Sequence, residues 1–176
     1  KAPKVFWTVG LVQFFCWCAF MYMWTYTNGA IAETVWNTTD TASAAYQEAG
    51  NWVGVLFAVQ AIGSVIWAML LPQFKNNKLA YSVSLILGGI GFISTMFIDA
   101  STAITLSSNI VIDAKYILFI SYLLIGCAWA AMLALPFTIL TNSISGKNMG
   151  TYLGLFNGTI CLPQIIAAAV GGGLLT

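Results

Sequence analysis

The chain contains no histidine and no arginine, and only 6% of its 176 residues are charged. A soluble domain carries roughly a quarter of charged residues, so the composition excludes that class. Binding of nucleic acid needs clustered basic side chains, so no nucleic-acid partner is expected. Hydrophobic residues make up 60% of the chain, in runs that reach the length of about 20 residues that a helix needs to cross a bilayer. The composition predicts a membrane protein.

Groups that support catalysis or bind metals are equally scarce. The sequence has no acid–base pair and no phosphate-binding loop inside its apolar runs, so we predict no catalytic residue, no cofactor and no enzyme activity. The four cysteines, Cys16, Cys18, Cys127 and Cys161, all lie within apolar runs. Cys16 and Cys18 point to opposite sides of a helix, which disfavours a metal or redox pair. We interpret all of them as small hydrophobic residues and predict no metal site.

Five apolar runs predict five membrane-spanning helices, at about residues 6–31, 52–74, 79–98, 116–140 and 151–175. Helices satisfy every backbone group inside lipid. The strict alternation of apolar and polar residues that marks transmembrane β-strands is absent. The predicted fold class is therefore an all-α membrane protein, with residues 1–176 in one transmembrane bundle.

The charges are expected in the loops between these runs, where they alternate in sign. Five of the six lysines precede the first run or follow the second and fourth, whereas all five acids follow the first and third. Lysine-rich segments stay on the cytoplasmic side during insertion. We therefore expect a multi-pass protein whose first residue is cytoplasmic. The expected location is a bacterial inner membrane. We also expect the chain to be a fragment, because it opens on a polar stretch without an initiator methionine.

The first run carries a stripe of amides and aromatic rings. Gln13, Trp17, Phe20, Trp24 and Asn28 fall within about 80° of one another on a helix. An amide that faces lipid is costly, so the stripe should face protein or a water-filled cavity. Sugars suit such a cavity, because amides bind hydroxyl groups and flat rings pack against a pyranose. Helix packing with interfacial tryptophans is the alternative interpretation, and we favour the cavity.

Two further runs carry shorter polar faces. Gln60 shares a face with Ser64 and serves either an interhelical hydrogen bond or a ligand. Trp129 shares a face with Pro136. That proline removes the hydrogen bond to the Met132 carbonyl and should bend the helix, which is a common packing feature of spanning helices.

The last run has two faces. Asn157 and Gln164 lie on one of them, near the Thr159 carbonyl that Pro163 frees, and serve either a polar ligand or a gating bend. The other face is a glycine ridge, formed by Gly150, Gly154 and Gly158 at a spacing of four residues. We interpret the ridge as a packing surface.

Two stretches resemble a known family. Residues 13–20 read QFFCWCAF, run on to Trp24, and resemble the seventh helix of the sucrose- and maltose-type sugar transporters of the major facilitator superfamily. Residues 129–137 (WA to LPF), 149–157 (MGTYLGLFN) and 163–164 (PQ) are similar to the tenth and eleventh helices. These transporters are related to the glycoside–pentoside–hexuronide cation symporters.

The resemblance implies the C-terminal six-helix half of a transporter, with the last helix and the N-terminal six-helix half missing. It also implies proton-coupled symport of a disaccharide by alternating access, with the coupling acids in the N-terminal half. Plant members carry acids near the outer end of the seventh helix, where this chain has Thr25, Tyr26, Thr27 and Asn28. Substrate choice is therefore not transferred from them.

The expected partners are a sugar, a coupling cation (a proton), the lipid bilayer and, for a lone half, a second copy. The candidate substrate-binding residues are Gln13, Trp17, Trp24, Asn28, Gln60, Trp129, Asn157 and Gln164. Two alternatives stay open: a helical interaction module that does not transport, and an exporter of a non-sugar solute from the same superfamily.

Overall fold

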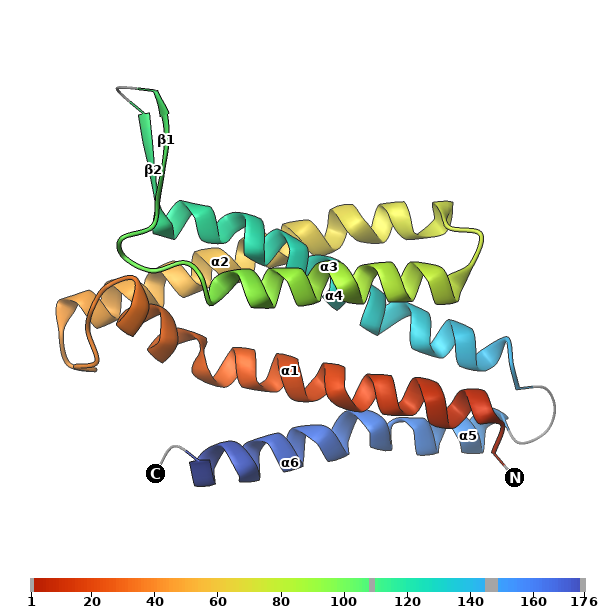
Figure 1. Ribbon diagram of the computed structural model, residues 1–176. Helices are drawn as coiled ribbons and strands as arrows, with labels where there is room; N and C mark the ends of the chain where they lie inside the picture. Colours follow the sequence, from red (N-terminus) through yellow and green to blue (C-terminus); the bar gives the residue numbers. More distant parts are fainter. Residues whose placement is uncertain (1, 108–109, 145–148, 175–176) are drawn as a thin grey trace. The chain divides into compact units, whose positions relative to one another are not determined.

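The computed structural model describes residues 2–107, 110–144 and 149–174. In chain order its helices are α1 (Lys4–Thr34), α2 (Ala44–Leu70), a 3-10 turn η1 (Leu71–Gln73), α3 (Asn77–Thr95), α4 (Ala114–Thr141), α5 (Met149–Phe156) and α6 (Gly158–Leu174) (Figure 1). Five helical segments are long and apolar enough to cross a membrane, with α2 and η1 forming one of them and α5 and α6 another. The prediction of five helices of membrane-spanning length and hydropathy is confirmed.

The helix boundaries differ from those predicted. The second helix begins at Ala44 rather than at residue 52, because the Ser43 hydroxyl caps it by accepting a hydrogen bond from the Tyr46 N–H at 3.2 Å. Its first two turns are polar, so hydropathy alone did not include them. The Asn76 side chain caps α3 in the same way, through the N–H groups of Lys78 and Leu79 at 2.9 and 3.2 Å.

A β-hairpin follows α3 and departs from the all-α expectation. β1 (Ala103–Ser107) pairs antiparallel with β2 (Ile110–Asp113), with Ile104 opposite Ile112. The segment is rich in β-branched residues, which favour strands. The β-branched pattern is present in the sequence, but it is too short to appear in a hydropathy average over the length of a helix.

Several charged residues lie in the end turns of helices and not in loops, which corrects the expectation for them. The helices include Lys4, Glu33, Glu48, Lys78 and Lys115. A spanning helix extends past the hydrocarbon into the headgroups, where the terminal side chains reach water. Lys1 and Lys147 lie outside the described residues.

The chain forms two compact units. The first unit comprises Lys1–Tyr26 and Met132–Thr176, and the second comprises Thr27–Ala131. The division falls inside α1 and inside α4, so each of these helices contributes to both units. Each unit has a core of its own.

The core of the first unit is aromatic where α1 meets α5. The Phe156 ring is fully buried and lies edge-on to Phe6 and Phe137, with ring centroids 5.9 and 5.4 Å apart. At Gly10 a Cβ would lie 3.1 Å from the Thr159 methyl group, so this glycine lets α1 and α6 approach closely. Ring packing and a small residue thus join the start of α1 to the last span.

The second unit packs α2, α3 and the first part of α4 through small residues. A Cβ on Gly63 would lie 2.7 Å from the Leu123 carbonyl oxygen, and one on Gly126 would collide with the Gln60 carbonyl. Backbone therefore touches backbone where α2 crosses α4. Between α3 and α4 the hydroxyl groups of Ser94 and Ser121 form a hydrogen bond of 2.7 Å.

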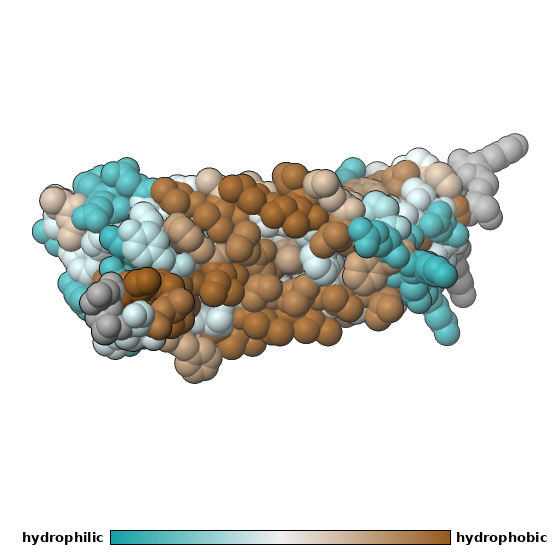
Figure 2. All heavy atoms as spheres, turned by 90° about the horizontal axis from the view of Figure 1, so that it is seen from above, coloured by the Kyte–Doolittle hydropathy of each residue, from teal (hydrophilic) through white to brown (hydrophobic). Residues whose placement is uncertain are grey.

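The outer surface of the second unit is apolar. Large exposed side chains on α2 and α3 include Ile62, Val65, Ile66, Ile86, Ile90 and Ile93. Figure 2 shows hydrophobic side chains across the middle of the face that it displays and hydrophilic ones towards its two ends. This distribution fits helices that are surrounded by lipid and end in water.

Candidate functional site

Gln13 of α1 is fully buried in the first unit, and its side-chain amide donates a hydrogen bond of 3.1 Å to the Met132 carbonyl oxygen. That carbonyl would normally accept from the N–H of residue 136, but Pro136 has none. The amide of α1 therefore satisfies the group that the proline of α4 leaves free. Two features that lie far apart in the sequence, Gln13 and Pro136, thus form one interhelical contact.

The rest of the stripe on α1 is partly closed by packing. Trp17 and Phe20 are buried. The Trp24 ring packs against both, with its centroid 6.3 Å from that of Trp17 and 6.0 Å from that of Phe20. Trp24 remains 39% exposed. Of the predicted stripe within this unit, Trp24 is the exposed ring.

Asn157 marks a break in the last span, between α5 and α6. Its side chain is exposed, and its carbonyl oxygen accepts from the N–H groups of Ile160 and Cys161 at 3.0 and 3.1 Å. The pair Asn157–Gly158 has low helix propensity, which explains the interruption here. The break leaves an amide on the surface of an otherwise apolar helix.

Gln164 lies two turns beyond Asn157 on the same side of the helix. It is half-buried, and its Nε2 donates to the Ile160 carbonyl at 3.1 Å. Cys161 lies between them and is exposed. Asn157, Cys161 and Gln164 thus form a continuous polar face, which we call the α5–α6 polar face. The helical period had predicted the shared face of Asn157 and Gln164.

Three candidate residues belong to the second unit. The Asn28 amide faces Gly50 of α2, where a Cβ would lie 3.4 Å from Oδ1, and this buried oxygen has no hydrogen-bond partner among the described residues. Gln60 is buried at the crossing of α2 and α4, and Trp129 is half-buried on α4. Gln60 therefore sits where two helices of the unit pack together.

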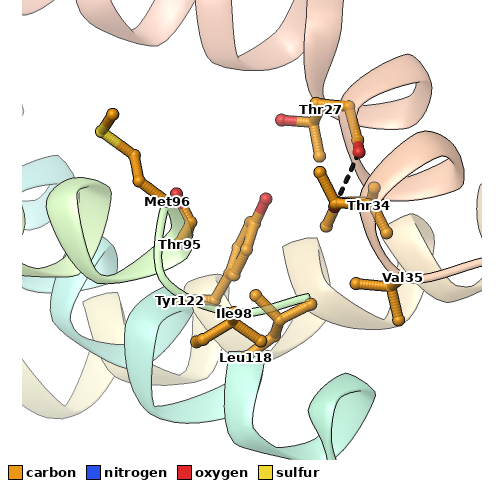
Figure 3. Close-up of a pocket in the computed structure, with 10 residues that line it drawn as sticks. Thr27, Thr34, Val35, Thr95, Met96, Ile98, Leu118 and Tyr122 are labelled. Carbon is orange, nitrogen blue, oxygen red and sulfur yellow. Dashed lines mark hydrogen bonds between the residues drawn. The ribbon is translucent and has the colours of Figure 1, made fainter. Parts of the chain in front are cut away.

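A cavity of about 380 Å³ lies in the second unit where the ends of α1 and α3 meet the beginning of α4 (Figure 3). Its lining comprises Thr27, Ala30, Ile31, Thr34, Val35, Thr95, Met96, Ile98, Leu118 and Tyr122. None of these lining residues is charged, and none of the predicted site residues is among them. The cavity was not foreseen, because it forms from three helix ends that are distant in the sequence.

The hydroxyl groups of the cavity differ in what they can do. Thr34 donates to the Ala30 carbonyl at 2.8 Å, and Thr95 donates to the Phe92 carbonyl at 2.7 Å. Thr27 and Tyr122 are buried and point their hydroxyl groups toward each other. The lining is thus an apolar surface with one buried pair of hydroxyl groups and no charge, which would suit an uncharged ligand.

The predicted site residues divide between the units. Gln13, Trp17, Trp24, Asn157 and Gln164 belong to the first unit, and Asn28, Gln60 and Trp129 belong to the second. The structure brings Trp17 and Trp24 into contact and places Asn157 and Gln164 on one face. Over the described ranges, no three histidine, cysteine or acidic side chains gather as metal ligands would. The chemistry on offer is hydrogen bonding by neutral groups and ring stacking.

Comparisons with protein-family models, with curated proteins and with solved structures found no match to this chain. The resemblance to sugar transporters of the major facilitator superfamily therefore stays a prediction.

Proposed function

We propose that the chain is part of a secondary transporter of the major facilitator superfamily that carries a sugar, a disaccharide of the maltose or sucrose type, together with a proton. The observation that carries the proposal is the exposed amide of Asn157 at the break between α5 and α6. A polar side chain that faces lipid is costly. Interrupted helices at membrane depth occur where they line a cavity or are buried in protein, and transporters bind solutes at such places.

The polar groups at membrane depth favour a neutral, hydroxyl-rich solute. The accessible ones in the first unit are the amides of Asn157 and Gln164, together with the partly exposed ring of Trp24, and the sequence places no acid or lysine in the middle of a span. Amides both donate to and accept from hydroxyl groups. An indole face is a flat apolar surface for the carbon side of a pyranose. A charged solute would lack a counter-charge here.

Proton coupling needs a titratable group within the membrane. This chain has no acid, histidine or lysine in the middle of a span, so the coupling acid would lie in an N-terminal half of the transporter. The two halves would open alternately to each side of a bacterial inner membrane, with Lys4 on the cytoplasmic side. The chain would bind solute and perform no catalysis.

Reconstituted transport tests this function. The protein that carries this chain is placed in liposomes, and uptake of radiolabelled maltose and sucrose is followed under an imposed proton gradient, with and without a protonophore. We expect one of the sugars to accumulate and the protonophore to abolish its accumulation. If neither sugar accumulates nor exchanges across the membrane, the proposal is wrong.

One observation favours a second candidate, an interaction module that does not transport. The glycine ridge of Gly150, Gly154 and Gly158 is uncovered, since a Cβ on any of the three would meet nothing within 4 Å. Such ridges let helices associate closely in membranes. If the chain is an interaction module, Gly154→Ile should abolish its self-association. Self-association is measured by energy transfer between labelled copies in liposomes. Leu155→Ile changes a neighbouring exposed side chain and serves as the control.

A further inference from the structure

The hairpin β1–β2 has two chemically different faces. Directly opposed residues share a face, so Ile104 and Ile112 lie on one side and Thr105 and Val111 on the other. Asp113, opposite Ala103, lies on the side of Thr105. One face is therefore aliphatic and the other mixed, and we call them the isoleucine face and the threonine face.

The hairpin is unusually apolar for an exposed element. Ile104 is 45% exposed and Leu106 is 64% exposed, and residues 103–112 contain no charged side chain. A lone two-stranded hairpin is marginally stable in water and needs a surface to pack against. The exposed side chains therefore call for an apolar partner.

The aromatic residues beside the hairpin identify its depth in the membrane. Trp52 Nε1 donates to the Lys115 carbonyl at 3.1 Å, and the Lys115 ammonium lies 5.5 Å from the centre of the Trp52 ring and 5.2 Å from that of Tyr116. Tryptophan and tyrosine with a nearby lysine are typical of the boundary between lipid and water. Lys115 comes two residues after Asp113, where β2 ends. The hairpin therefore leaves the helices at this boundary.

The direction of the hairpin agrees with that depth. Figure 1 shows β1 and β2 running across the direction of α3 and α4 and projecting away from them. Where these helices cross a bilayer, the hairpin extends along its surface. The exposed apolar side chains of α2 and α3 would contact the acyl chains of the same bilayer.

We propose that the hairpin is a membrane-surface anchor, with its isoleucine face resting in the lipid at the boundary of headgroups and acyl chains and its threonine face in water. The partner is the lipid surface of the leaflet in which α4 begins. The anchor fixes the level of α4 in the membrane. This role of the hairpin does not depend on which solute, if any, the protein transports.

Two single cysteine variants, Ile104→Cys and Thr105→Cys, test the proposal in the full protein. Each is reconstituted in phosphatidylcholine liposomes with a charged maleimide present on both sides, so that orientation does not matter. We expect Ile104→Cys to react about tenfold more slowly than Thr105→Cys, because the reactive thiolate is disfavoured away from water. The unmodified protein measures the background of the native cysteines, and unfolding in detergent should bring the two rates together.

A second readout separates lipid from protein as the covering surface. A fluorophore attached at Ile104→Cys should be quenched by lipids brominated near the headgroup more strongly than one attached at Thr105→Cys. Equal labelling rates in liposomes would show water on both faces and overturn the proposal. Slow labelling without quenching, or an Ile104→Cys disulfide whose yield rises with protein density, would identify a second copy as the partner and also overturn it.

Discussion

The two compact units accommodate polar groups in a membrane protein in different ways. In the first unit Pro136 removes one backbone hydrogen bond of α4, and the last span is interrupted at Asn157. Side-chain amides lie at both places. In the second unit α2 and α3 have no internal proline, and glycines bring their backbones close to α4. The second unit is thus the more closely packed of the two, and under the proposed function it is the scaffold while the first unit binds the solute.

The largest effect is expected at the helix crossing of the second unit. Gly126→Ala places a Cβ against the Gln60 carbonyl and within 2.8 Å of the Ser64 nitrogen. Overpacking of this kind costs about 3 kcal/mol. We expect a marked fall in the midpoint of thermal unfolding, followed by circular dichroism in detergent.

Gly54→Ala in α2 is the matched control, because its Cβ would meet nothing within 4 Å. Alanine is a better helix former than glycine, so this variant should be unchanged or more stable by up to about 1 kcal/mol. Equal losses in both variants would refute the assignment of the second unit as the close-packed scaffold.

The contact between Gln13 and Met132 tests the first unit. Gln13→Leu leaves the Met132 carbonyl buried without the amide donor, which we expect to cost about 1–2 kcal/mol. Pro136→Ala restores a backbone N–H that can reach the same carbonyl. In that background Gln13→Leu should cost less, and a double-mutant cycle of unfolding free energies measures the difference. A loss of the same size in both backgrounds would mean that the freed carbonyl is not the reason for the amide.

Asn157 tests whether the interrupted helix binds the solute. Asn157→Ala removes one amide from the α5–α6 polar face, and loss of one hydrogen bond to a sugar should weaken binding about tenfold. Apparent affinity is measured from sugar uptake into liposomes. Leu162→Ala alters an exposed side chain of α6, in the same span, and should leave the affinity unchanged. Equal apparent affinities in Asn157→Ala and Leu162→Ala would mean that the Asn157 amide does not bind the sugar.

The smallest effect concerns pH and a loop of the second unit. The Ser101 hydroxyl and N–H, at 2.6 and 2.8 Å, and the Thr102 hydroxyl donate to Asp99 and lower the pKa of its carboxyl group. A carboxyl whose pKa is lower in the folded state contributes stability above its unfolded pKa, and this is lost as pH falls through the folded pKa. We expect a slight fall in the unfolding midpoint below about pH 4.

The fully exposed position of Asp99 keeps this effect small. Asp99→Asn should remove the pH-dependent part while the midpoint near neutral pH changes little. If the unfolding midpoint of Asp99→Asn still falls at low pH by the same amount, other carboxyl groups cause the pH dependence.

A structural feature can be predicted from this sequence where its signal extends over many neighbouring residues. The five spans follow from hydropathy summed over neighbouring residues, and the face shared by Asn157 and Gln164 follows from the helical period. The capped start of α2 at Ser43 and the hairpin at Ile104 were missed. Their signals are only a few residues long and were outweighed by the longer apolar pattern.

The sequence by itself determined that the chain has five membrane-length helices and which residues share a face of each. Only the tertiary structure decided which group covers each face. Gln13 meets a carbonyl 119 residues away, Ser94 meets Ser121, and the lining of the cavity comes from three helix ends. The physical reason is that hydropathy and helical period are properties of neighbouring residues, whereas a hydrogen bond between helices depends on how the chain returns to itself.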